Sequence, residues 1–239
     1  MPTTTLYTAS PDLKSQRASL KVGAARISFY LAVACLLLIV ILHFLKNDLA
    51  PDAHMLSEYA IGEFGWVMQL AFFCWAASCV SLPFVLRPFI ANTKGRVGLM
   101  LLVVTGLALI MGGIFIIDSP YDAPPVPTQH GSLHGVSAMI GLPGQAIATL
   151  LISYSLVKND NWQSARKYIL VWAHLTWISL VLMFASTFIM FAVSNGKFSG
   201  ETGIGWFNRL LVLVYCGGLI TVSRHALQIN KTLTSISKR

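Results

Sequence analysis

Side chains that could carry out acid-base, nucleophilic or metal chemistry stand in four separate segments, each beside a long apolar stretch. They supply one hydroxyl, two carboxylates, two imidazoles and one guanidinium: Ser57, Glu58, Asp118, His130, His134 and Arg209. In an apolar setting each such group is costly alone and tolerable when paired. We therefore expect Glu58, Asp118, His134 and Arg209 to form one polar network, with His134 within hydrogen-bond reach of an acid.

The spacing of His130 and His134 allows a metal site. Residues four apart lie on one face of a helix, so both imidazoles could bind one zinc ion, with Asp118 or Glu58 as an oxygen ligand. Two histidines without a third assured ligand are a weak zinc signature. The alternative is that His134 hydrogen-bonds Asp118 or Glu58 across a packed helix pair.

Ser57 and Arg209 each have two interpretations. Ser57 could act as a nucleophile with His134 as its base, but the sequence lacks a G-x-S-x-G motif, and the position before Glu58 favours a helix-capping role. Arg209 either extends to the lipid headgroups or turns inward to pair with Glu58 or Asp118.

Six apolar stretches must position these residues. They cover residues 27–45, 65–86, 97–117, 134–157, 168–193 and 206–222, and each can cross a hydrocarbon core of about 30 Å at roughly 1.5 Å per residue. The sequence predicts an all-α polytopic membrane protein with six transmembrane helices over residues 26–228. Residues 1–25 lack apolar periodicity and are expected to form a flexible cytoplasmic tail, and 229–239 a short basic one.

Charge predicts the orientation. Most lysines and arginines fall in the tails and in the second and fourth loops, and the exceptions are Lys46, Lys197 and Arg209. Acids show the opposite bias, with Asp48, Asp52, Glu58, Glu63, Asp118, Asp122 and Glu201 in the odd-numbered loops. Because short basic loops stay cytoplasmic, both termini are expected inside and the site residues outside. The net charge of +8 then reflects topology and contact with anionic membrane lipid, not nucleic-acid binding.

Glycines predict where two of these helices meet. The fourth stretch begins with Gly131-x-x-x-Gly135 and continues to Gly141 and Gly144, while the third contains Gly106, Gly112 and Gly113. Small residues let transmembrane helices approach closely. We therefore expect the third and fourth helices to pack together at their outer ends, with Gly135 at the contact.

Several short motifs resemble those of a bacterial membrane family known as domain of unknown function 998. They are Leu56-Ser57-Glu58-Tyr59 with Gly62 and Gly65-Trp66, Gly113-Ile114-Phe115-x-x-Asp118, and Thr128-x-x-Gly131-x-Leu133-His134. The resemblance extends from about residue 25 to 228, although Ile116 replaces the family's proline. It implies a six-span protein of the bacterial cytoplasmic (inner) membrane and no established activity. The layout is also distantly similar to the Frag1/DRAM/Sfk1 proteins.

Two functions follow from these features. In the first, the outer polar residues bind a lipid or another small ligand in a protein that senses, carries or organises it. In the second, they form a metal-assisted lipid hydrolase in which Glu58 or Asp118 activates a bound water. The layout of Ser, Asp and His resembles that of the alkaline ceramidase group of intramembrane hydrolases, but those have seven spans and histidines late in the chain. This sequence has no histidine near the outer ends of its fifth and sixth stretches. That difference favours binding, and the oligomeric state is left open.

The orientation can be tested by cysteine labelling. In intact cells, an Asp122→Cys variant should react with a membrane-impermeant thiol reagent, and an Asn161→Cys variant should not, because only the first position lies in an outer loop. Labelling in the reverse pattern would contradict the predicted orientation and place the site residues on the cytoplasmic side.

Overall fold

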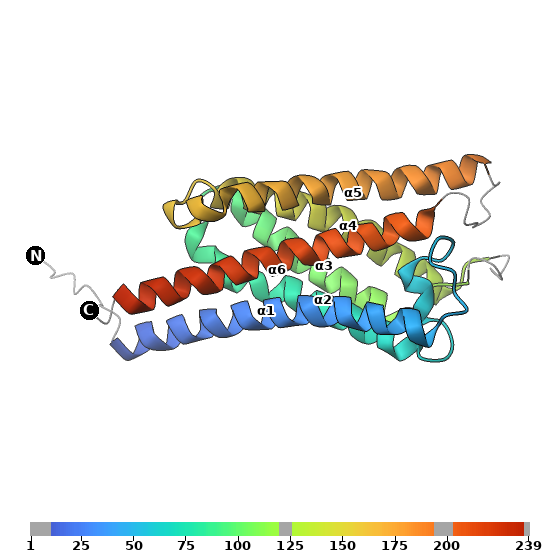
Figure 1. Cartoon of the computed structure of the whole chain (residues 1–239), viewed down its shortest axis with the longest axis horizontal. Helices are drawn as coiled ribbons and strands as arrows, with labels where there is room; N and C mark the ends of the chain where they lie inside the picture. Colours follow the sequence, from blue (N-terminus) through green and yellow to red (C-terminus); the bar gives the residue numbers. More distant parts are fainter. Residues whose placement is uncertain (1–10, 120–125, 194–202, 237–239) are drawn as a thin grey trace, which may run out of the picture.

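The structure is a computed structural model that describes residues 11–119, 126–193 and 203–236. These residues form helices and connecting segments, with no strand among them (Figure 1). The six long helices are α1 (Pro11–Leu45), α2 (Gly65–Leu86), α3 (Thr93–Ile114), α4 (Gln129–Leu156), α5 (Arg166–Val193) and α6 (Ile204–Ile236). Three short 3₁₀ helices lie between them: η1 (Leu56–Ala60), η2 (Arg87–Phe89) and η3 (Asp160–Ala165).

Each long helix contains a stretch that is long and apolar enough to cross a membrane. Large apolar side chains also point away from the bundle, among them Phe44, Met100 and Phe188, which are 79%, 69% and 76% exposed. A surface this apolar is unusual for a protein surrounded by water but suits one surrounded by lipid tails. The predicted fold class, an all-α integral membrane protein with six spans, is confirmed.

The first and last helices extend beyond the predicted spans. α1 begins at Pro11, inside the segment 1–25 that was expected to be a tail, and α6 continues to Ile236. Proline suits the first turn of a helix, and adding turns to an existing helix avoids the cost of nucleation. Residues 1–10 and 237–239 of the two predicted tails lie outside the described ranges.

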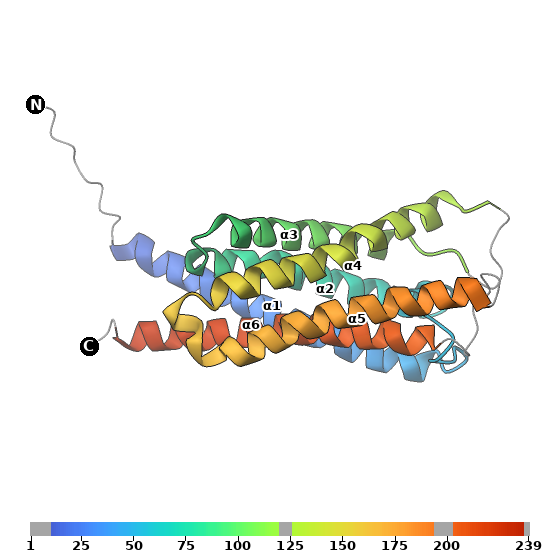
Figure 2. The same cartoon turned by 90° about the horizontal axis from the view of Figure 1, so that it is seen from above.

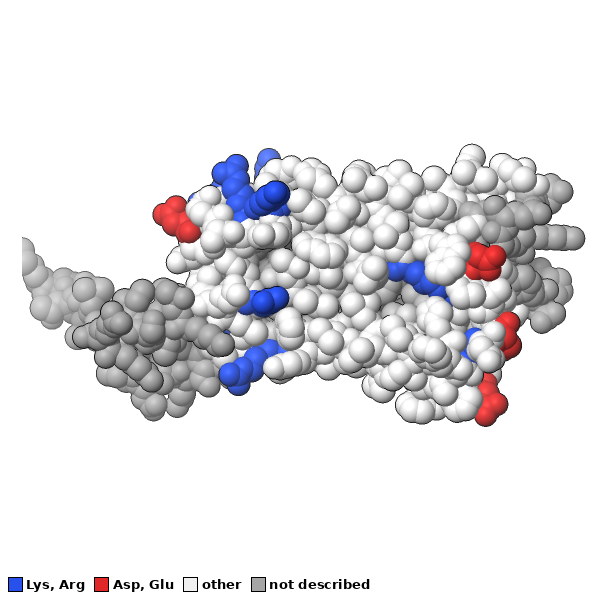
Figure 3. Space-filling model, in the orientation of Figure 1, with Lys and Arg blue, Asp and Glu red and all other residues white. Residues whose placement is uncertain are grey.

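The helices pack side by side in chain order, and α6 closes the ring against α1 (Figures 1 and 2). Both termini lie at one end, which we call the basic end because most of the basic side chains in view gather there (Figure 3). The opposite end, which we call the acidic end, carries the 46–64 loop, the end of α3 and the start of α4.

Three buried serines join helices in the half of the bundle nearer the basic end. Ser223 of α6 donates a hydrogen bond to the Ser28 hydroxyl of α1 at 2.8 Å, and Ser78 of α2 donates to the Ser28 carbonyl at 2.8 Å. All three side chains are fully buried. Small hydroxyl side chains allow close packing and satisfy one another where lipid offers no partner.

The predicted contact between α3 and α4 is confirmed, but it does not use Gly135. A Cβ atom on Gly98 would lie 3.0 Å from Ile152 and 3.1 Å from the Ala148 carbonyl oxygen, so these helices need glycine there. A Cβ on Gly135 would meet nothing within 4 Å, and this glycine is exposed. Gly135 lies on a different face of α4 from His134, which is buried.

This difference predicts opposite effects of two matched substitutions. Gly98→Leu should lower the stability of the protein by about 1–3 kcal/mol, because the new side chain would push α3 away from α4. Gly135→Leu should leave stability unchanged or raise it slightly, because leucine favours the helix and has open space. Thermal unfolding in detergent would check both, and equal melting temperatures would contradict the assigned contact.

Candidate functional site

Arg209 on α6 is the centre of a hydrogen-bond network at the acidic end. Its Nη1 donates to the His54 carbonyl at 2.7 Å, its Nη2 to the Tyr59 hydroxyl at 2.8 Å, and its Nε to His43 Nε2 at 2.8 Å. His43 Nδ1 donates in turn to the Ile39 carbonyl at 2.7 Å, which leaves Nε2 as the acceptor. Arg209 therefore ties α6 to α1 and to the 46–64 loop.

Tyr59 connects this network to the rest of the loop. Its hydroxyl donates to the Leu49 carbonyl at 3.1 Å while accepting from Arg209. Burial raises the pKa of the Tyr59 phenol, although the charge and the hydrogen bond of Arg209 act in the opposite direction. The phenol therefore stays protonated at neutral pH, as its donation to Leu49 requires.

Lys46 and Glu58 also fold the 46–64 loop onto itself. The ammonium group of Lys46, which is buried, donates to the backbone carbonyls of Tyr59 and Ile61. Glu58, which is 3% exposed, binds His54 Nδ1 at 2.6 Å and accepts from the Met55 backbone N–H at 2.7 Å. The two described exceptions to the charge pattern, Lys46 and Arg209, thus both hold this loop, whereas Lys197 lies outside the described residues.

Asp118 holds the start of α4. One of its carboxylate oxygens accepts from the Thr128 hydroxyl at 2.5 Å, and the other accepts from the Thr128 backbone N–H at 2.9 Å. The Thr128 side chain also caps α4 by accepting from the Gly131 N–H at 3.0 Å. A Cβ atom on Gly131 would collide with the Asp118 carboxylate, so glycine is required there.

His134 lies inside the bundle with its ring turned toward the end of α3. Its Nδ1 is 2.8 Å from the Phe115 carbonyl and 3.2 Å from the Gly112 carbonyl. Because carbonyls only accept, Nδ1 carries the hydrogen and Nε2 keeps a lone pair. The ring also packs edge-to-face against Phe72, with the ring centroids 5.9 Å apart. His134 is therefore held in one orientation.

The predicted single network is not formed. Arg209 of α6 bonds to the 46–64 loop, and Glu58 bonds within that loop. Asp118 holds the cap of α4, and His134 bonds to backbone carbonyls instead of an acid. His130 packs against Phe115 instead, with the ring centroids 5.4 Å apart.

The metal hypothesis fails for a related reason. No group of three or more His, Cys, Asp or Glu side chains in the described part of the chain is placed so that it could hold a metal ion. The predicted set of His130, His134 and Asp118 is therefore not brought together as a metal site. The carboxylate of Asp118 is already used by Thr128, and the Nδ1 of His134 by the end of α3.

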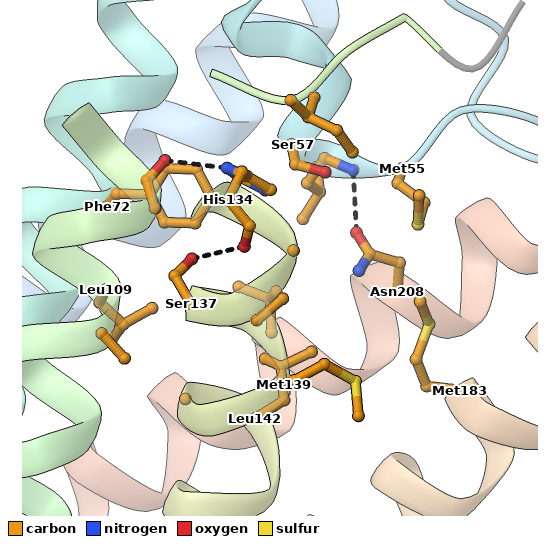
Figure 4. Close-up of a pocket in the computed structure, with 18 of the residues that line it drawn as sticks. Met55, Ser57, Phe72, Leu109, His134, Ser137, Met139, Leu142, Met183 and Asn208 are labelled. Atoms are coloured by element: carbon orange, nitrogen blue, oxygen red, sulfur yellow. Dashed lines mark hydrogen bonds between the residues drawn. The ribbon is translucent and has the colours of Figure 1, made fainter. Parts of the chain in front are cut away.

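Beside these groups the bundle contains a cavity of 230 Å³. The 46–64 loop and all the long helices except α1 contribute to its wall, which is mostly apolar and carries no Lys, Arg, Asp or Glu. Its lining includes Met55, Phe72, Leu109, Met139, Leu142 and Met183 (Figure 4).

Polar contacts close the cavity near the middle of the bundle. Tyr215 of α6 donates to the Leu142 carbonyl at 2.8 Å, in the turn of α4 next to Pro143, and Trp75 donates to Gln145 at 3.0 Å. Toward the acidic end, α4 and α5 diverge from the connection that joins them (Figures 1 and 2). Met139 of α4 and Phe184 of α5 both line the cavity and are 63% and 40% exposed, so the cavity opens between these helices.

Three polar groups face the cavity without a partner among the described residues: the Ser57 hydroxyl, His134 Nε2 and Asn208 Nδ2 (Figure 4). Asn208 is oriented by its Oδ1, which accepts from the Leu56 N–H at 2.8 Å. Ser57 is the second residue of η1, whose N-cap is Met55, so the expected capping role is wrong. Asn208 stands beside Arg209 among the outer polar residues of the sequence, but the predicted site did not include it.

Fold and cavity together define a six-helix integral membrane protein with a ligand-sized chamber in one half of its bundle. Residues 31–225 match the family described as protein of unknown function (DUF998), and the chain belongs to that family. No curated protein and no solved structure matches the chain. The likeness to the Frag1/DRAM/Sfk1 proteins stays a prediction.

Removal of the Arg209 guanidinium should destabilise the acidic end. Arg209→Gln leaves His43, Tyr59 and the His54 carbonyl with unpaired polar groups, so we expect a loss of about 3 kcal/mol. Arg224→Gln, at an exposed position on the same helix, should have little effect. Thermal unfolding and limited proteolysis of the 46–64 loop would measure the difference, and two equally stable variants would show that Arg209 does not hold the loop.

Proposed function

We propose that this protein binds the apolar chain of a membrane amphiphile in the 230 Å³ cavity, and that the chain enters from the lipid between α4 and α5. The observation that carries this proposal is the cavity itself, which has a mostly apolar wall and lies inside the bundle. The exposed lining residues Gly135, Met139 and Phe184 lie where a chain would pass from the bilayer into the wall.

The volume favours one chain over a whole lipid. A cavity of 230 Å³ exceeds the roughly 150 Å³ that holds a benzene-sized molecule and is below the about 300–1,000 Å³ of drug-sized sites. A lipid with two acyl chains would therefore insert one of them at most. The remainder of such a molecule would stay between α4 and α5 or in the surrounding bilayer.

The driving force must come from packing and polar contacts. Lipid tails are as apolar as leucine, so a chain gains no hydrophobic free energy when it leaves the bilayer for the cavity. An unfilled cavity of 230 Å³ would cost about 5.5 kcal/mol on a scale of about 24 cal/mol per Å³, and a chain that restores the lost dispersion contacts recovers part of this. Selectivity then depends on the polar groups of the wall.

The charges support an orientation for the site. Most of the basic side chains in view gather at the basic end and most of the acidic ones at the opposite end (Figure 3), the distribution expected when the basic end is cytoplasmic. We infer that the acidic end, and with it the cavity, lies in the outer half of a bacterial cytoplasmic membrane.

Occupancy of the cavity would act on the 46–64 loop. Residues 55–57 of this loop line the wall, and the Leu56 backbone is bonded to Asn208 on α6. A bound chain would therefore contact the loop, α4, α5 and α6 at once and favour one arrangement of them. This supports a protein that senses or organises lipid through the shape of its outer surface.

Closing the opening between α4 and α5 should strongly reduce the binding of an amphiphile chain in the cavity. We would label the protein in nanodiscs with a long-chain alcohol, or with its methyl ether, that carries a diazirine midway along the chain. Gly135→Leu should lower the cross-linking of residues in the cavity wall about tenfold, because its side chain fills the entrance without disturbing the fold. Gly23→Leu is the matched control, since a Cβ at Gly23 also meets nothing within 4 Å and lies far from the cavity.

Two outcomes of this experiment would contradict the proposals. Wild-type protein that gives no cross-link in the cavity wall with either probe would overturn the proposed function. Equal labelling of wild type and Gly135→Leu would overturn the assigned entrance.

A further inference from the structure

We propose that the cavity selects an amphiphile with an uncharged, hydroxyl-bearing head, recognised by Ser57, His134 and Asn208. This inference rests on the proposed function and names the class of ligand. It begins from the three cavity-facing polar groups that have no partner among the described residues, which come from the 46–64 loop, α4 and α6 (Figure 4).

The other polar groups of the wall are already used. Ser137 donates to the carbonyl of His134 at 2.7 Å, and Thr187 donates to the carbonyl of Met183 at 2.9 Å. These hydroxyls satisfy their own helices, as is usual for Ser and Thr in transmembrane helices. Recognition of a ligand therefore falls to the three remaining groups.

Charged heads fit this wall poorly. None of the lining residues is Lys, Arg, Asp or Glu. The charged groups at the same end face other partners: Glu58 binds His54, Asp118 binds Thr128, and Arg209 binds the 46–64 loop. A phosphate, carboxylate or ammonium in the cavity would lose its hydration without gaining a counter-charge.

The three free groups match a hydroxyl in their donor and acceptor pattern. Asn208 Nδ2 is an amide nitrogen and only donates, and the bond from the Leu56 N–H to Oδ1 fixes the orientation of the amide. His134 Nε2 only accepts, because Nδ1 carries the ring hydrogen toward the carbonyls of Phe115 and Gly112. A ligand hydroxyl can donate to His134 Nε2 and accept from Asn208 Nδ2. The Ser57 hydroxyl can either donate to the ligand or accept from it. An ether or ketone accepts only and leaves His134 unpaired.

Chain and head would then occupy different parts of the cavity. Ser57 and Asn208 lie toward the acidic end, whereas Leu142 and Met139 lie deeper along α4 (Figure 4). The head would lie beneath the 46–64 loop, and the chain would follow the apolar wall toward the opening between α4 and α5. This is the orientation of an amphiphile whose head lies near the outer membrane surface.

Head chemistry can be tested with probes that share one chain. Wild-type protein should be labelled about tenfold more by the diazirine-bearing alcohol than by its methyl ether, because the ether cannot donate to His134. Unlabelled fatty alcohol should compete better than the alkyl phosphate, the fatty acid or the alkyl trimethylammonium of the same length.

Two variants test whether His134 and Asn208 of the cavity wall cause the preference for the alcohol. His134→Asn keeps a donor toward the carbonyls of α3 but removes the acceptor Nε2, so alcohol and ether should label it equally. Asn208→Asp keeps an acceptor for the Leu56 N–H and adds a negative charge, so it should favour the alkyl amine over the alcohol. Gly23→Leu should retain the wild-type preference for the alcohol.

The failures of the two proposals are distinguishable. If alcohol and ether label the wild-type cavity equally, or if a charged head competes best, the assignment of the head is wrong while chain binding stands. If His134→Asn is folded and keeps the wild-type preference for alcohol, His134 is not the acceptor. Absence of labelling by both probes would contradict chain binding itself.

Discussion

The guanidinium of Arg209 joins α6 to α1 and to the 46–64 loop, and the shape of the acidic end depends on it. A partly buried cation near the end of an apolar helix is costly unless its donors are satisfied. Two carbonyls, an imidazole nitrogen and a phenol oxygen accept from it at 2.7–2.9 Å. These acceptors come from separate parts of the chain, so the contact fixes the loop as well as stabilising the charge. Because residues 55–57 of that loop line the cavity, Arg209 also determines where the cavity ends.

Asn208, the residue before Arg209 in the sequence, makes different contacts. Consecutive side chains on a helix point about 100° apart, so Asn208 and Arg209 face different surroundings although they are neighbours in sequence. Arg209 turns toward α1 and the loop, while Asn208 faces the cavity and holds the Leu56 backbone. Near the basic end, Ser28, Ser78 and Ser223 draw α1, α2 and α6 together. The serine contacts and the cavity thus lie in different halves of the bundle.

The sequence predicted the fold better than the site, for physical reasons. Span number, the pairing of α3 with α4 and the family follow from apolar length, small residues and motifs. Gly135 shows the limit: a small-residue pattern suggests that a helix has a close contact, but it does not say which of its glycines faces the neighbouring helix. The predicted acid and histidine network failed because each acid found donors close by in the chain, Glu58 at His54 and Met55, and Asp118 at Thr128. Residues at equal depth need not face one another.

His134 illustrates why the geometry favours recognition over hydrolysis. A histidine that serves as general base becomes positively charged during the reaction, and a carboxylate at its second nitrogen usually stabilises that charge. Here the second nitrogen faces the carbonyls of Phe115 and Gly112, which fix the ring and its hydrogen but offer only partial negative charge. The same features suit an acceptor that must keep its lone pair directed at a ligand hydroxyl, since the ring can neither rotate freely nor exchange its hydrogen between the two nitrogens without losing both backbone bonds.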